Sequence, residues 1–246
     1  MDIAHSGPTK GVAPHDVVID ELHGLDEMNQ LRVTAGAVWG GAAADMVSAD
    51  FLMALAHGGG YVVGARSGDH MVGCSFGFLA RHDGDWCLHS HITGVIPRLQ
   101  NSGLGHAIKA HQFRWAADHG LPAITWTFDP LVRRNGWFNL RKLGARAVEY
   151  HIDFYGALDD DINGSGETDR LLARWEIAGT TDVGTGPTIE VATPDDIVTL
   201  RRKDPAAAHR WRLDMRERLA PLMARNVIVG MNERGDYLVR VKERVK

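Results

Sequence analysis

The chain has 246 residues, of which 44% are hydrophobic and 24% charged, and its formal net charge is −4. This composition is typical of a globular protein with a sizeable core and excludes disordered, collagen-like and fibrous chains. The acidic balance and the lack of a helix-turn-helix pattern argue against nucleic acid as a partner, and no apolar run is long enough to cross a membrane. Two cysteines cannot form a disulfide framework, so we expect a reducing, cytoplasmic location. The sequence leaves a homodimer open.

The first half of the chain begins with a Gly-, Pro- and Ser-containing segment, residues 1–14, which we interpret as a flexible tail. A strand is expected at 17–22, a helix at 26–38 and a second helix after the capping residue Ser48. β-type runs at 61–63, 71–79 and 86–95 alternate with Gly/Asp turns, which predicts an antiparallel meander. A helix at 103–119 and a strand at 123–128 complete this part.

The second half continues with an expected helix at 134–143 and an alternating, half-exposed strand at 147–155. Loops are expected at 159–166 and 179–186, on either side of a short helix near 169–175. The remainder predicts a strand from 188, a helix start at 193–196, a long arginine-rich helix at 206–224 and two closing strands. We therefore expect a domain at 15–160 with a C-terminal extension, 161–246, packed on it.

Two motifs invite enzymatic interpretations. Residues 73–77 match the G-x-S-x-G motif of serine hydrolases, but that motif requires a turn into a helix, and β-type sequence continues here. We interpret it as a glycine-rich strand. His89 and His91 would share one strand face, yet no third ligand accompanies them, so no metal is expected.

The most informative segment is residues 95–106. Strand residues end, a polar loop containing Gly103 and Gly105 follows, and an apolar-striped helix begins. Backbone N–H groups at a helix N-terminus, with no Cβ in the way, form an anion site suited to a pyrophosphate. The third glycine of the dinucleotide fingerprint is missing, and a simple tight turn is the alternative interpretation.

The spacing Gln100-x-x-Gly103-x-Gly105 after an antiparallel meander resembles the acyl-CoA pyrophosphate loop of the GNAT N-acetyltransferase superfamily. Further segments resemble a group of its predicted acetyltransferases that have a C-terminal extension, and the likeness covers roughly residues 17–240. These segments are Ser90-His91, residues 126–131 (WTFDPL), Asn135, Asn139, residues 142–144, Tyr155-Gly156 and Asp169-Arg170. The resemblance implies an α/β fold with a mixed, mostly antiparallel sheet flanked by helices and a C-terminal α/β extension.

The resemblance also implies an acyl-CoA co-substrate, with acetyl-CoA and succinyl-CoA as candidates, and a small amine or amino-acid derivative as acceptor. The backbone of Val95 would align the pantetheine arm, and Asn135 would contact the cofactor or the thiol. The pyrophosphate would lie on the loop formed by Gln100, Asn101, Ser102, Gly103, Leu104, Gly105 and His106. Many relatives have a tyrosine that protonates the leaving thiolate, but Leu140 stands at that position here.

Acyl transfer to an amine requires a base, because the attacking nitrogen must be neutral. His89 and His91 are the candidates, and half-buried structural histidines are the alternative. Asp129 would hold a cationic substrate or cap the turn before Pro130. Tyr150 or Tyr155 would replace the missing acid, unless each is a packing residue.

The arginine-rich helix carries Arg210, Arg212, Arg216 and Arg218, which form either a solvated face or a bidentate contact to a carboxylate of the acyl group or substrate. We expect an N-acyltransferase that works by direct attack in a ternary complex. The alternative is a non-catalytic acyl-CoA sensor, which the missing tyrosine favours.

Overall fold

The computed structural model describes residues 17–40, 47–156, 166–179 and 186–241. The expected tail at 1–14 and most of the two expected loops therefore lie outside the described residues. Within the described residues, ten strands follow the hydrogen-bonded order β1-β2-β3-β4-β5-β7-β6-β9-β10-β8. Their bounds are β1 Val18–Glu21, β2 Tyr61–Ser67, β3 His70–His82, β4 Asp85–Val95, β5 Ala123–Phe128, β6 Arg146–His151, β7 Arg170–Glu176, β8 Thr188–Val191, β9 Val227–Met231 and β10 Tyr237–Arg240.

The sheet is mixed and mostly antiparallel, as the sequence predicts. β4 and β5 run parallel, while β1 pairs with β2, β2 with β3, β5 with β7, and β6 with β7 in antiparallel registers. The expected meander is present as β2, β3 and β4. Asp83 and Gly84 both have positive φ, at 52° and 90°, as the tight turn of a two-residue hairpin loop requires.

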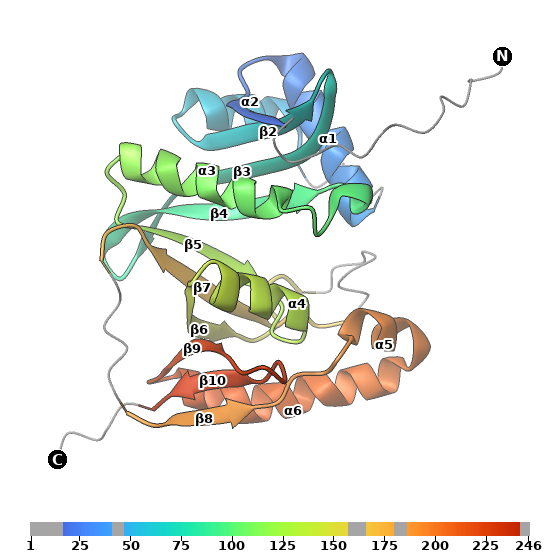
Figure 1. Ribbon diagram of the computed structural model, residues 1–246, viewed down its shortest axis with the longest axis vertical. Helices are drawn as coiled ribbons and strands as arrows, with labels where there is room; N and C mark the ends of the chain where they lie inside the picture. The colour runs from blue at the N-terminus through green and yellow to red at the C-terminus, as the bar shows by residue number, and fades with distance from the viewer. Residues whose placement is uncertain (1–16, 41–46, 157–165, 180–185, 242–246) are drawn as a thin grey trace. The chain divides into compact units, whose positions relative to one another are not determined.

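The described residues form two compact units, and β3 and β4 contribute to both. The first unit contains residues up to 77 together with 92–112. Its helices are α1 Leu25–Trp39, α2 Ala49–His57 with Ser48 as its N-cap, the 3₁₀ turn η3 Pro97–Leu99 and the start of α3 Leu104–Asp118. α1 packs against α2, and one core cluster joins both helices to β2 and β3 (Figure 1).

The second unit contains residues 78–91 and those from 113 onward. Its later helices are α4 Arg133–Gly136, the π-helical segment η4 Trp137–Lys142, α5 Ile197–Lys203 and α6 Pro205–Met223. α6 packs against β6 and β8 (Figure 1). Asp204 caps α6 by accepting the Ala207 N–H, and Pro205 occupies the first turn, where a missing N–H is tolerated.

Three expectations need correction. The segment near 169–175 is the strand β7 and not a helix, because its backbone pairs with β5 along one edge and with β6 along the other, and Leu171, Leu172 and Ala173 are buried. The strand expected at 147–155 ends at His151, and a turn with Asp153 at a φ of 46° follows. The helix expected at 134–143 is present, but its second half is π-helical, with the Leu143 N–H donating to the Phe138 carbonyl.

The G-x-S-x-G match lies within β3, as the glycine-rich strand interpretation predicts. Ser75 is fully buried, and its hydroxyl lies 2.8 Å from both the Ile92 carbonyl and the Thr93 hydroxyl. A Cβ on Gly73 would lie 3.1 Å from the Gly94 carbonyl, so close strand packing explains that glycine. In the part of the chain that the structure describes, no helix combines the length and apolarity needed to cross a bilayer.

Candidate functional site

The loop after β4 is fixed at both ends by core packing within the first unit. Val95, Leu104 and Ile108 belong to one buried cluster, which joins the strand end to the start of α3. The Ile96 N–H donates to the Val72 carbonyl, and the Gln100 side chain lies 3.4 Å from the Val95 carbonyl. The intervening backbone is therefore presented from a rigid base.

The loop backbone leaves amides unpaired at the N-terminus of α3. Asn101 and Gly103 have positive φ values of 63° and 94°, which turn the chain into the helix. The first intrahelical bond runs from the Ala107 N–H to the Gly103 carbonyl. The amides of Gly105 and His106 precede that bond, and neither has a partner among the described residues. These donors lie at the positive end of the helix dipole, which favours an anion.

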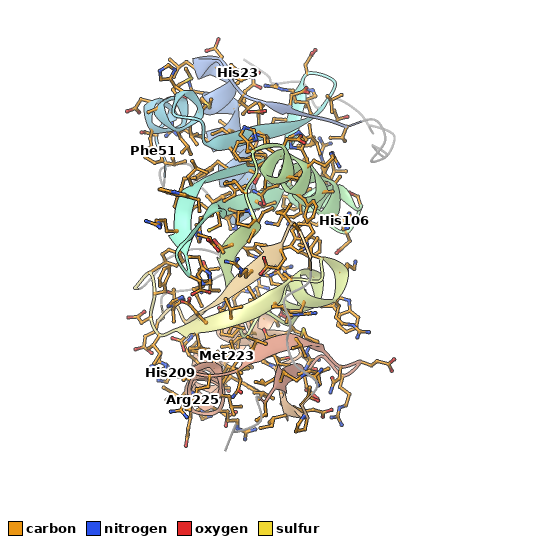
Figure 2. All side chains as sticks on the ribbon, turned by 90° about the vertical axis from the view of Figure 1, so that its left-hand side faces the viewer. His23, Phe51, His106, His209, Met223 and Arg225 are labelled. Atoms are coloured by element: carbon orange, nitrogen blue, oxygen red, sulfur yellow. The ribbon has the colours of Figure 1, made fainter. Side chains whose placement is uncertain are left out.

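Space beside these amides is open. A Cβ built on Gly105 meets no atom within 4 Å, and its φ is an ordinary one, so neither packing nor strain within the protein requires glycine there. The exposed His106 side chain projects from the same turn (Figure 2). The missing Cβ instead leaves room for a bulky ligand against the backbone.

The second unit contains the histidine candidates in a row of rings. Phe78 from β3 lies with its ring centre 5.2 Å from that of His89 and 5.9 Å from that of His91. The ring of Tyr155, 37% exposed, lies 6.5 Å from that of His91. The sequence-predicted pair, His89 and His91, thus lies together on one aromatic surface, with ring centres 6.4 Å apart.

The two histidines differ in environment. His89 Nδ1 lies 3.1 Å from the Thr125 hydroxyl, which fixes its ring. The His91 ring has exposed area, yet its aromatic neighbours replace part of its water, and this desolvation lowers its pKa below 6.5. His91 is therefore neutral near pH 7 and can accept a proton.

Asp129 is only 5% exposed, and both oxygens of its carboxylate have partners within the protein. Oδ1 accepts the Leu131 N–H at 2.8 Å, so Asp129 caps the turn. Burial alone would raise the pKa of Asp129, but nearby guanidinium groups outweigh it and keep that pKa below its usual value. These positive charges, from Arg170, Arg201 and Arg212, repel a cation, so the geometry gives no support to binding of a cationic substrate by Asp129.

The Tyr150 hydroxyl also has a partner within the protein. Its hydroxyl donates to Asp169 Oδ2 at 2.6 Å. Burial, and then this hydrogen bond, raise the pKa of Tyr150 far above its ordinary value, which makes it a poor proton donor to a thiolate. Leu140, at the position of the expected acid, is buried at 3% exposure.

The predicted site residues divide between the two units. Val95 and the loop from Gln100 to His106 belong to the first, whereas the catalytic candidates and Asn135 belong to the second. Asn135 is half-buried in α4. Phe78 and Arg201 are not among the residues predicted from sequence, and Arg170 enters there only through the family resemblance, because only contacts between distant segments connect these residues to the candidates.

No family model and no curated protein matches the sequence. Solved structures do match the fold. A GNAT-family protein from Desulfovibrio desulfuricans is 19% identical, with a TM-score of 0.52, over 66% of this chain and 99% of that one. An IAA acetyltransferase from Bacillus cereus is 15% identical, with a TM-score of 0.50, over 65% and 99%. An aminoglycoside 6'-acetyltransferase type Ii is 16% identical, with a TM-score of 0.51, over 66% and 99%. The chain therefore has the fold of the GNAT acetyltransferases.

Proposed function

We propose that the protein is an acyl-CoA-dependent N-acyltransferase that transfers an acetyl or succinyl group to a small amine or amino-acid derivative. The observation that carries the proposal is the loop before α3, whose Gly105 and His106 amides face open space at a helix N-terminus. The fold supports it, since the three similar structures are named as GNAT or acetyltransferase proteins.

In this proposal, the pyrophosphate lies on the loop amides, and His91 acts as the base. The amine nitrogen attacks the thioester carbonyl carbon while its proton passes to the His91 imidazole. The carbon–sulfur bond then breaks, and the sulfur leaves as a thiolate. Because the pKa of a thiol is about 8.5, the thiolate is a tolerable leaving group without a tyrosine to protonate it. The Ile96 N–H donates to the Val72 carbonyl, and in this proposal the Val95 amide stabilises the oxyanion.

Residues 15–160 would then form the acyl-CoA-binding domain, and residues 161–246 would add a wall to the acceptor site. The free, buried thiols of Cys74 and Cys87 support a reducing compartment such as the cytoplasm.

The test is turnover with acetyl-CoA and with succinyl-CoA against a panel of small amines. Thiol release is followed colorimetrically, and N-acylated product is followed by mass spectrometry. Equal amounts of thiol and amide are expected. Saturable binding of acyl-CoA with no product from any amine would overturn the enzyme proposal and favour the sensor. Heat-inactivated protein is the control for spontaneous transfer.

A further inference from the structure

A group of arginines surrounds Asp129 in the second unit. The three guanidinium groups all approach the same carboxylate oxygen, Oδ2, within 3.8 Å. They come from different elements, namely Arg170 in β7, Arg201 in α5 and Arg212 in α6. The other carboxylate oxygen is already bonded to the Leu131 N–H.

A fourth arginine adjoins this group. Arg216 lies 2.7 Å from Asp169 and 2.7 Å from Glu167. Because the side chains of Arg170 and Arg212 are only 7% exposed, water does little to screen the charges around Asp129.

Arg212 provides an independent sign of a missing partner. The residue is 6% exposed, and its Nη2 lies 3.2 Å from Asp129. Its Nη1 is buried and has no hydrogen-bond partner among the described residues. Buried donors without a partner are rare and destabilising, above all when they are charged, so such a site points to a ligand.

The cluster adjoins the row of rings that contains His91. The Arg170 guanidinium lies 5.4 Å from the ring centre of Tyr155, and that ring also lies beside His91. Tyr155 is 37% exposed, and the Arg201 side chain is 13% exposed, so these two residues form the accessible side of the cluster.

We propose that Arg212, with Arg201 and Arg170, binds a carboxylate of the reacting molecules, so that the favoured acceptor is a small amine that also bears a carboxylate. This inference rests on the proposed function. A carboxylate would supply the acceptor atoms that Arg212 Nη1 lacks, and guanidinium groups suit planar anions of this kind. The same chemistry is present in the distal carboxylate of a dicarboxylic acyl donor.

The test uses amino acids of the form H₂N–(CH₂)n–COO⁻ and their primary amides, which differ in charge at one end. With wild-type protein, kcat/KM for the best acid should exceed that for its amide at least tenfold. Arg212→Met should remove this preference through KM while changing the amide rate less than twofold. Arg218→Met is the matched control, because Arg218 lies on the same helix in an exposed pair with Asp214.

Two further arms separate the outcomes. If Arg212→Met removes a preference for succinyl-CoA over acetyl-CoA and leaves acceptors unaffected, the bound carboxylate belongs to the donor. Thermal unfolding with the free acids alone tests the site without any turnover, so failure of the acyltransferase proposal remains distinguishable. Circular dichroism checks folding, and Arg201→Met provides a second variant. Equal use of acid and amide by wild-type protein together with an unchanged donor preference in Arg212→Met, or an acid preference that survives in both variants, would overturn the inference.

Discussion

Replacing Gly105 by alanine should have opposite effects on the free protein and on its complex with CoA. The added Cβ meets no protein atom within 4 Å, and the residue has an ordinary φ in the first turn of α3. Exchange of glycine for alanine in a helix stabilises by up to about 1 kcal/mol. The free energy of unfolding of the free variant should therefore be unchanged or higher by that amount.

The same methyl group would occupy the space assigned to the pyrophosphate. We expect CoA affinity to fall at least about tenfold, which corresponds to about 1.4 kcal/mol. At a CoA concentration of 100 times the wild-type Kd, stabilisation by ligand should fall from about 2.7 to about 1.4 kcal/mol. For a chain of this size, 1 kcal/mol shifts Tm by about 2–4 °C, so the CoA-induced shift should fall by roughly half.

The assay is thermal unfolding of wild-type and variant protein, each with and without CoA. Gly230→Ala in β9 is the control, because its Cβ also meets no atom within 4 Å and its φ is ordinary. Equal CoA-induced shifts in wild-type protein and Gly105→Ala would refute the assignment of the open space. A large loss of stability in the free variant would contradict the claim that the fold does not require Gly105.

Three other predictions follow from buried and titrating groups. Because the base must be neutral and the pKa of His91 is lowered, kcat/KM should fall with decreasing pH through a midpoint below 6.5. His91→Ala should abolish that limb and His89→Ala should keep it, whereas an unchanged limb in His91→Ala would exclude His91. Burial lowers the pKa of Lys109, which donates to Gln112, to about 7. The unfolded chain then binds one more proton than the folded protein between about pH 7 and the ordinary value of 10.5, so stability should rise with pH across that window, by up to about 1.4 kcal/mol per pH unit. Urea unfolding of Lys109→Met should lack this slope, and an identical slope in wild type and variant would count against a neutral Lys109. The free energy of unfolding of Ser75→Ala should be lower by about 1 kcal/mol, because two hydrogen bonds are lost, while acyl transfer should stay within twofold of wild type. Loss of activity in folded Ser75→Ala protein would instead support Ser75 as a nucleophile.

The loop before α3 could be predicted from sequence because its signal is local. A strand end, two glycines and a helix start occupy about twelve consecutive residues. Glycine at these two positions indicates a tight turn and space for a ligand against the backbone. The positive φ of Gly103 and the open space at Gly105 agree with that interpretation.

The strand β7 could not be recognised in the same way. Leu171, Leu172 and Ala173 are consecutive and all buried, so both faces of this strand are covered and its apolar run shows no alternation. Such a run cannot be told from a buried helix by periodicity. The polar loops expected on either side favoured the wrong choice.

The arginine cluster depends on contacts that sequence spacing does not reveal. Arg201 and Arg212 meet Asp129 across 72 and 83 residues of chain, respectively. The same long-range packing turns Asp129 from a candidate ligand for a cation into the centre of a positively charged region.

Calorimetric titration of acetyl-CoA into the wild-type protein measures directly whether the protein binds an acyl-CoA. We expect one saturable site per chain, with the affinity reduced at least about tenfold in Gly105→Ala. Absence of saturable binding at millimolar acetyl-CoA by folded protein would contradict it, since the loop from Gln100 to His106 would then be only a turn between a strand and a helix.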